Sequence, residues 1–147
     1  MYLLDTNIVS LLDPRREAYS PEVVAWIRRN GAHLWLSVVT LIELEAGSLK
    51  LRREGKDQRA DAYRALRQAI EVDFGDRLLV LGGAVALRVA RIAELARPVV
   101  IEFKDLIIAA TAQTHGLTVL TRNLRHFEPT RVPCLDPMTS LPSDAEQ

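Results

Sequence analysis

The residues that decide the fold are YLLDTN at positions 2–7. Residues 2–4 form a short apolar run, the pattern of a buried strand, and the polar residues after them can cap a helix. The apolar residues at positions 8–12 continue as a short helix, which Asp13-Pro14 ends. The start of the chain therefore predicts a strand that passes directly into a helix, with Asp5 at the junction.

Strands and helices alternate along the rest of the chain. Apolar and β-branched runs predict further strands at residues 34–39, 78–81, 117–120 and 132–135. Helical spacing of apolar residues predicts helices at residues 21–29, from residue 40, over 50–70, after Gly82-Gly83 and over 105–115. Such alternation is typical of an α/β fold with right-handed crossovers around a mainly parallel sheet, here of about four to five strands.

Length and composition set limits on the kind of protein. A chain of 147 residues with 48% apolar and 26% charged residues is expected to form one domain, over residues 1–140, followed by a flexible tail at 141–147. Nineteen basic and nineteen acidic side chains cancel, so no overall field attracts nucleic acid. Cys134 has no partner for an internal disulfide, and no apolar run or secretory signal indicates a membrane or export, so we expect a cytoplasmic protein.

Acidic or amide side chains stand where predicted strands end or helices begin: Asp5, Glu43, Asp105 and Asn123. In open parallel sheets ligands bind outside the carboxyl ends of the strands. Asp5 and Asn123 each follow a strand, and Glu43 lies early in the helix after the second strand. Asp105 is assigned to the same edge because of the long loop that precedes it. An oxygen-rich cluster of this kind suits Mg²⁺ or Mn²⁺.

Each of these residues has a plainer explanation when taken alone. Asp5 can cap a helix, Asp105 can complement a helix dipole, and Asn123 can stabilise a turn. Glu43 can be a solvated helix residue. However, Gly47 lies one turn later on the same face and leaves the backbone bare, which indicates that something approaches closely there. The set indicates a site more strongly than any member.

Other kinds of site fit the sequence less well. His33, His115 and His126 lack the paired spacing of zinc ligands, and no Ser-His-Asp constellation or phosphate-binding glycine loop is present. Arg122 and Arg125 flank the proposed cleft and could hold a phosphate backbone.

The motifs together resemble a PIN-domain nuclease, specifically the toxin of VapBC-type toxin–antitoxin pairs. The resemblance extends over nearly the whole chain and rests on blocks that occur in order: Asp5-Thr6-Asn7; Ser37 to Glu43 with Gly47; Asp105 to Ala112; and Leu120 to Asn123 with Phe127. One block alone is weakly specific, whereas the ordered set is specific.

The resemblance implies an α/β/α sandwich with Mg²⁺- or Mn²⁺-dependent endoribonuclease activity. It also implies a homodimer and larger assemblies with a VapB-like antitoxin whose tail covers the active site. Asp5, Glu43 and Asp105 would hold the metal, and Asn123 stands where many members have a fourth acid. His126 occupies a position where aspartate is also frequent. Residues that would position water or the ligands are Thr6, Asn7 and Thr121.

Two alternatives stay open at this point. In the first, the chain is a catalytically weak or inactive binding subunit whose acids only cap helices. In the second, Asp5 accepts a phosphoryl group as in receiver domains, although the acid pair that such domains place early in the chain is missing. The helices at residues 23–27 and 40–70 are the expected contacts for a dimer partner and an antitoxin.

Overall fold

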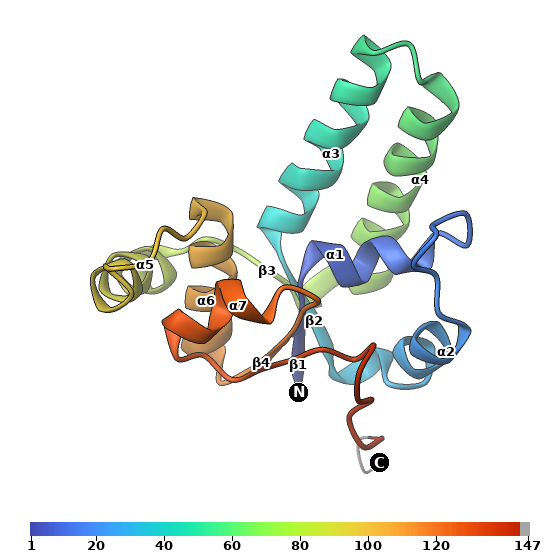
Figure 1. Cartoon of the computed structure of the whole chain (residues 1–147). Coiled ribbons are helices and arrows are strands. Elements are labelled where there is room, and N and C mark those ends of the chain that lie inside the picture. The colour runs from blue at the N-terminus through green and yellow to red at the C-terminus, as the bar shows by residue number, and fades with distance from the viewer. Residues whose placement is uncertain (145–147) are drawn as a thin grey trace.

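The fold is seen in a computed structural model that describes residues 1–144. Within these residues the strands form one five-stranded sheet, and every neighbouring pair is parallel (Figure 1). In spatial order the strands are β3 (Leu78–Leu79), β2 (Leu34–Ser37), β1 (Tyr2–Leu4), β4 (Thr118–Leu120) and β5 (Cys134–Leu135). The predicted α/β class with a parallel sheet is confirmed.

Helices cover both faces of the sheet, which makes the three layers that the resemblance implied (Figure 1). They are α1 (Thr6–Val9), α2 (Pro21–Arg29), α3 (Val38–Arg53), α4 (Asp57–Phe74), α5 (Gly83–Leu95), α6 (Phe103–His115) and α7 (Leu124–Phe127). Short 3-10 turns lie at Ser10–Leu12, Gly31–His33, Gly75–Arg77 and Glu128–Thr130. No helix in residues 1–144 has both the length and the apolar character needed to cross a membrane.

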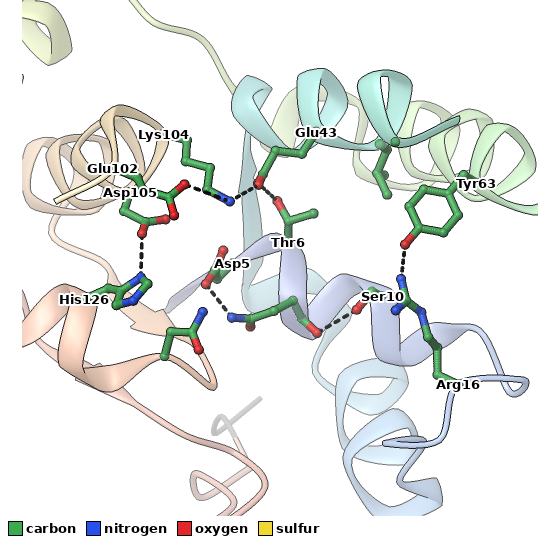
Figure 2. A pocket seen from close by; sticks show the side chains of 14 residues that line it. Asp5, Thr6, Ser10, Arg16, Glu43, Tyr63, Glu102, Lys104, Asp105 and His126 are labelled. Carbon is green, nitrogen blue, oxygen red and sulfur yellow. Dashed lines mark hydrogen bonds and ion pairs between the residues drawn. The ribbon is translucent and has the colours of Figure 1, made fainter. Parts of the chain in front are cut away.

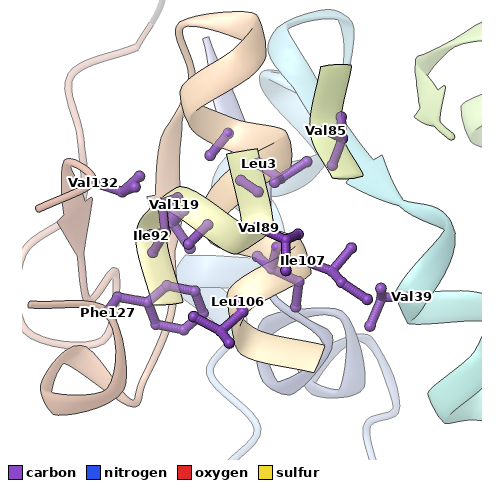
Figure 3. Close-up of a cluster of buried hydrophobic side chains, with 14 of the residues drawn as sticks. Leu3, Val39, Val85, Val89, Ile92, Leu106, Ile107, Val119, Phe127 and Val132 are labelled. Carbon is purple, nitrogen blue, oxygen red and sulfur yellow. The ribbon is translucent and has the colours of Figure 1, made fainter. Parts of the chain in front are cut away.

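Successive side chains of each strand pack into opposite layers, as strand geometry requires. Leu3 and Val119 join a core with α5, α6 and α7, which Figure 3 shows in close-up. The next residues, Leu4 and Leu120, join a second core with α1, α2 and parts of α3 and α4. The sheet is therefore buried on both faces, which explains why its strands are continuous apolar runs.

The strands are shorter than the sequence predicted. β2 ends at Ser37 instead of residue 39, because the Ser37 side chain accepts a hydrogen bond from the Val39 amide at 3.3 Å and caps α3. β3 contains only Leu78–Leu79 of the expected 78–81, and β5 begins at Cys134, after Pro133. β-branched residues such as Val38 and Val39 therefore belong to a helix in spite of their strand preference.

The single helix expected over residues 50–70 is wrong. α3 ends at Arg53, and α4 begins at Asp57 after a turn in which Gly55 has a φ of +72°. This left-handed conformation favours glycine and ends the helix. The two helices form a hairpin that extends beyond the sheet (Figure 1).

The described residues end before the last three positions of the chain. Residues 145–147 of the expected flexible tail lie outside them. Within the described part, the Asp144 carboxylate accepts a hydrogen bond from the Asn30 side chain at 2.8 Å. The domain boundary at residue 140 stays a prediction.

The order of the strands places a crevice at the end of β1. The chain adds β2 and β3 on one side of β1 and then β4 and β5 on the other, so the direction of winding reverses there. Ligands of open parallel sheets bind at such reversal points, outside the carboxyl ends of the strands. Asp5 is the first residue after β1, and its amide donates to the carbonyl of Leu120 in β4 at 2.9 Å.

Because the sheet is buried on both faces, a cavity in one of its strands should lower the free energy of unfolding strongly. Leu36 is fully buried in β2, so Leu36→Ala should lower the free energy of unfolding by about 2–5 kcal/mol. Val72 in α4 is 82% exposed, so Val72→Ala is a matched control with a change of about 0.5 kcal/mol or less. Urea denaturation of both variants measures this difference, and equal stabilities would contradict the assigned core.

Candidate active site

A cleft of about 420 Å³ opens at the carboxyl edge of the sheet. Figure 2 shows side chains from both halves of the chain pointing into it. Its lining residues are Asp5, Thr6, Asn7, Ser10, Arg16, Glu43, Leu44, Gly47, Tyr63, Glu102, Lys104, Asp105, Asn123 and His126. The cleft therefore brings together all the residues for which the sequence predicted catalysis, with four carboxylates facing two cations and one histidine.

Asp5 lies at the floor of the cleft, and the residue is 5% exposed. Oδ2 accepts hydrogen bonds from the hydroxyl of Thr121 at 2.7 Å and from the side-chain amide of Asn7 at 2.8 Å. Burial, with repulsion from Asp105 and Glu43, raises the pKa of Asp5 to about 6, although the Thr121 hydrogen bond opposes the rise. The floor of the cleft thus holds a carboxylate that is costly to ionise when no cation is near.

Glu43 enters the cleft from the second turn of α3 and carries its own partners. Oε1 forms an ion pair with Nζ of Lys104 at 2.8 Å, and Oε2 accepts a hydrogen bond from the hydroxyl of Thr6. The hydrogen bond to Glu43 raises the pKa of Lys104, which also lies 3.5 Å from Glu102. Lys104 is thus the cation that balances this side of the cleft.

Asp105 belongs to the first turn of α6 and is 5% exposed. Because α6 leads into the parallel strand β4, it runs against the strands and its first residues lie over their carboxyl ends. Asp105 Oδ2 lies 2.9 Å from Nδ1 of His126, and burial raises the pKa of Asp105 against the effect of that hydrogen bond.

The remaining predicted residues have different positions. Asn123 lines the cleft just before α7, and its backbone N–H donates to the Thr121 hydroxyl at 3.0 Å. Arg122 is exposed and lines an adjoining depression instead of the cleft. Arg125 is exposed and lines neither of these hollows.

Sequence reasoning missed several residues of the cleft. The resemblance marks the position of His126 as one where aspartate is frequent but gives the histidine no role, and its contact with Asp105 depends on the short helix that follows Asn123. Lys104 was hidden because its importance depends on Glu43, sixty-one positions away. Arg16 and Tyr63 come from a loop and from a helix whose start was not recognised.

The exposed backbone that the sequence predicted at Gly47 is in contact with another side chain. A methyl group at this position would lie 2.9 Å from Cε1 of Tyr63, so the tyrosine ring packs directly over the glycine. The close approach that the sequence indicated is therefore made by a side chain of the neighbouring helix α4.

The cleft suits a hard divalent cation in its chemistry, since its negatively charged donors are all carboxylates. The buried and mutually repelling Asp5 and Asp105 would gain from such an ion. In the conformation described, Glu43 is paired with Lys104, and within residues 1–144 no three His, Cys, Asp or Glu side chains are grouped closely enough to hold a metal ion. A cation bound by the three carboxylates would take over the role that Lys104 has here.

Known proteins share this architecture over most of the chain. The model of the PIN domain family matches residues 2–131. Toxin FitB of Neisseria gonorrhoeae is 36% identical over 130 residues, covering 86% of this chain and 91% of FitB. Ribonuclease VapC2 of Haemophilus influenzae is 32% identical over 136 residues, covering 86% of this chain and 89% of that protein. The crystal structure of FitAcB from Neisseria gonorrhoeae superposes with a TM-score of 0.78 at 34% identity, covering 93% and 98% of the two chains.

The raised pKa of Asp5 predicts that the site costs stability when no metal is bound. In chelator at about pH 7, Asp5→Asn should unfold at a higher temperature than the parent, because a neutral amide replaces a buried charge. The folded parent takes up a proton near pH 6, whereas unfolded aspartate does so near pH 3.8. The parent should therefore gain about 1 kcal/mol relative to Asp5→Asn as the pH falls from about 7 to about 5.

Denaturant titrations at several pH values measure this difference. Subtracting the variant from the parent removes the contributions of groups that do not interact with Asp5, whereas its repulsion by Asp105 and Glu43 stays part of the measured difference. A difference that stays constant between these pH values would contradict the environment assigned to Asp5.

Proposed function

The chain belongs to the PIN domain family, and from this membership and its acidic cleft we propose that it is a metal-dependent endoribonuclease. The observation that carries the proposal is the meeting of Asp5, Glu43 and Asp105 in one cleft from three separate parts of the chain. A relative that is 32% identical is named a ribonuclease, which supports RNA as the substrate.

The three carboxylates would hold Mg²⁺ or Mn²⁺, which lowers the pKa of bound water and stabilises negative charge on phosphoryl oxygens. The protein's own part is to hold these carboxylates in place. Thr121 and Asn7 fix one oxygen of Asp5, and Thr6 fixes one oxygen of Glu43. Such supporting hydrogen bonds orient metal ligands and are costly to lose.

Other residues of the cleft have roles that follow from their contacts. His126 orients Asp105 through Nδ1. Lys104 neutralises Glu43 before a cation binds, and its ammonium group can then contact a phosphate of the substrate. Asn123 lines the cleft without a charge and can position water there.

A binding subunit without activity is the second candidate. It is favoured by one observation, namely that each carboxylate already has a protein partner in the conformation described. In that case the acids would have no catalytic role, and a metal would neither bind tightly nor support cleavage.

Replacement of one carboxylate separates these candidates. Asp105→Asn should lower cleavage of a fluorogenic RNA oligonucleotide in Mg²⁺ or Mn²⁺ by at least about a thousandfold, because a metal ligand and its charge are lost. Chelator should have the same effect on the parent. Asp76→Asn is the matched control, since Asp76 is exposed and lies outside the cleft. Cleavage by Asp105→Asn at the parent's rate would refute the catalytic assignment.

We also propose that an antitoxin restrains this activity in the cytoplasm, where the RNA substrate is found. A relative that is 36% identical is named a toxin. α3 offers a surface for such a partner: Ile42 and Leu49 are 64% and 59% exposed and line a groove of about 640 Å³ with Leu41, Glu45, Ala46 and Arg67. An exposed apolar groove on a helix is a common docking site for an amphipathic helix.

The other expected contact surface is not available. Val23, Val24, Trp26 and Ile27 of α2 are buried in the chain's own core. For a homodimer we propose the opposite side of the molecule, where Leu87, Val100 and Phe103 are exposed.

A charge in the groove should disrupt binding of the antitoxin. Ile42→Asp should lower the amount of the product of an adjacent small open reading frame that copurifies with the chain by at least about tenfold, because an unpaired charge would enter an apolar interface. Val72→Asp, on an exposed position of α4 outside the groove, is the control. Light scattering of both preparations also reports whether the chain is a dimer. Equal copurification by the two variants would place the antitoxin elsewhere.

A further inference from the structure

The cleft extends beyond the carboxylates to a pair of residues at its other end. Figure 2 shows Arg16 and Tyr63 across Thr6 and Ser10 from Asp105 and His126. The Arg16 guanidinium donates a hydrogen bond to the Tyr63 hydroxyl, and its carbon lies 5.3 Å from the centre of the tyrosine ring. Neither residue touches the carboxylates, so the proposed chemistry does not explain them.

The ring of Tyr63 can lie here because Gly47, which faces it from α3, has no side chain. It packs on Gly47 so closely that a methyl group there would collide with Cε1 and Cδ1, at 2.9 and 3.0 Å. Glycine inside a helix costs about 1 kcal/mol relative to alanine. Gly47 lies one turn after Glu43, on the face of α3 that lines the cleft, so the helix is weakened at the site itself.

Arg16 connects the cleft to the neighbouring surface. It lines the acidic cleft, a depression of about 420 Å³ with Arg15 and Arg59, and another of about 490 Å³ with Arg122. Asp13 and Glu17 also line these depressions, and Arg15 is ion-paired with Asp13 at 2.9 Å. Arg16, Arg59 and Arg122 are therefore the cations that adjoin the acidic cleft. A polyanion that must enter a cleft rich in carboxylates needs such cations along its path.

We propose that Arg16 and Tyr63 form a nucleotide-binding subsite for the single-stranded RNA that adjoins the bond to be cleaved. Tyr63 stacks on a base, and Arg16 contacts a backbone phosphate. Aromatic rings beside cationic side chains are the usual means of holding single strands without strict sequence preference. The inference rests on the proposed ribonuclease function and adds the part of the substrate that the carboxylates do not contact.

A purely structural role gives different expectations. In that case the pair only ties the loop after Ser10–Leu12 to α4, and its loss would lower stability without changing RNA affinity or the dependence of that affinity on salt.

The test measures binding of fluorescein-labelled single-stranded RNA of mixed sequence by anisotropy, in the full-length Asp105→Asn background and at constant Mg²⁺. Tyr63→Leu should weaken binding about tenfold, whereas Tyr63→Phe keeps the ring and should stay within about threefold of the background. Arg16→Gln should weaken binding and reduce the slope of log Kd against log salt by about 0.7, the contribution of one phosphate contact on a single strand. Arg97→Gln is the control for loss of charge. The Arg97 side chain is 77% exposed and follows the end of α5, outside the cleft.

The outcomes distinguish this subsite from the proposed function. RNA affinity and salt slope unchanged by Arg16→Gln, with affinity also unchanged by Tyr63→Leu, would overturn the subsite even if the parent cleaves RNA. Weaker binding by the leucine variant, at an unchanged unfolding temperature and with full affinity of the phenylalanine variant, supports it. Weaker binding that appears only with a lower unfolding temperature would assign the ring to packing on Gly47 and overturn the subsite. A parent that binds RNA through the pair but never cleaves it would refute the nuclease and leave the subsite in place.

Discussion

The site depends on holding like charges close together at one edge of a parallel sheet. Asp5 and Asp105 are nearly buried, and both have raised pKa values, so their ionised forms are opposed by the surroundings. Neutral donors such as Thr121 offset part of this cost, and Lys104 balances Glu43. The reversal of winding at β1 makes such an arrangement possible, because it leaves the floor of the cleft open between two crossovers.

The parallel sheet and the meeting of the acids could be predicted from the sequence because both follow from short-range patterns. An apolar run that ends in an acidic residue indicates a strand and its carboxyl end, as at Asp5. Asp105 was placed correctly for an incomplete reason. The long loop before it matters less than the direction of α6, which must run against the strands in order to lead into β4.

Other features could not be predicted from the sequence, mainly because they depend on contacts between distant positions. The turn at Gly55 breaks a pattern of alternating charged and apolar residues that reads as one helix. Lys104 has no signal in the sequence, and the sequence gives His126 no role, because their parts in the site depend on Glu43 and Asp105. Gly47 was the exception, since a glycine inside a helix marked a close approach without showing what approached.

Helix α3 lines the cleft with one face and the apolar groove with another. One face presents Glu43 and Gly47 to the cleft, and another presents Ile42 and Leu49 to the apolar groove. A ligand that shifts the helix from either side must also shift the groups on the other. Thermodynamic reciprocity then requires that a protein bound in the groove and an RNA bound in the cleft change each other's affinity by the same factor, so a regulator could control this molecule without reaching the carboxylates.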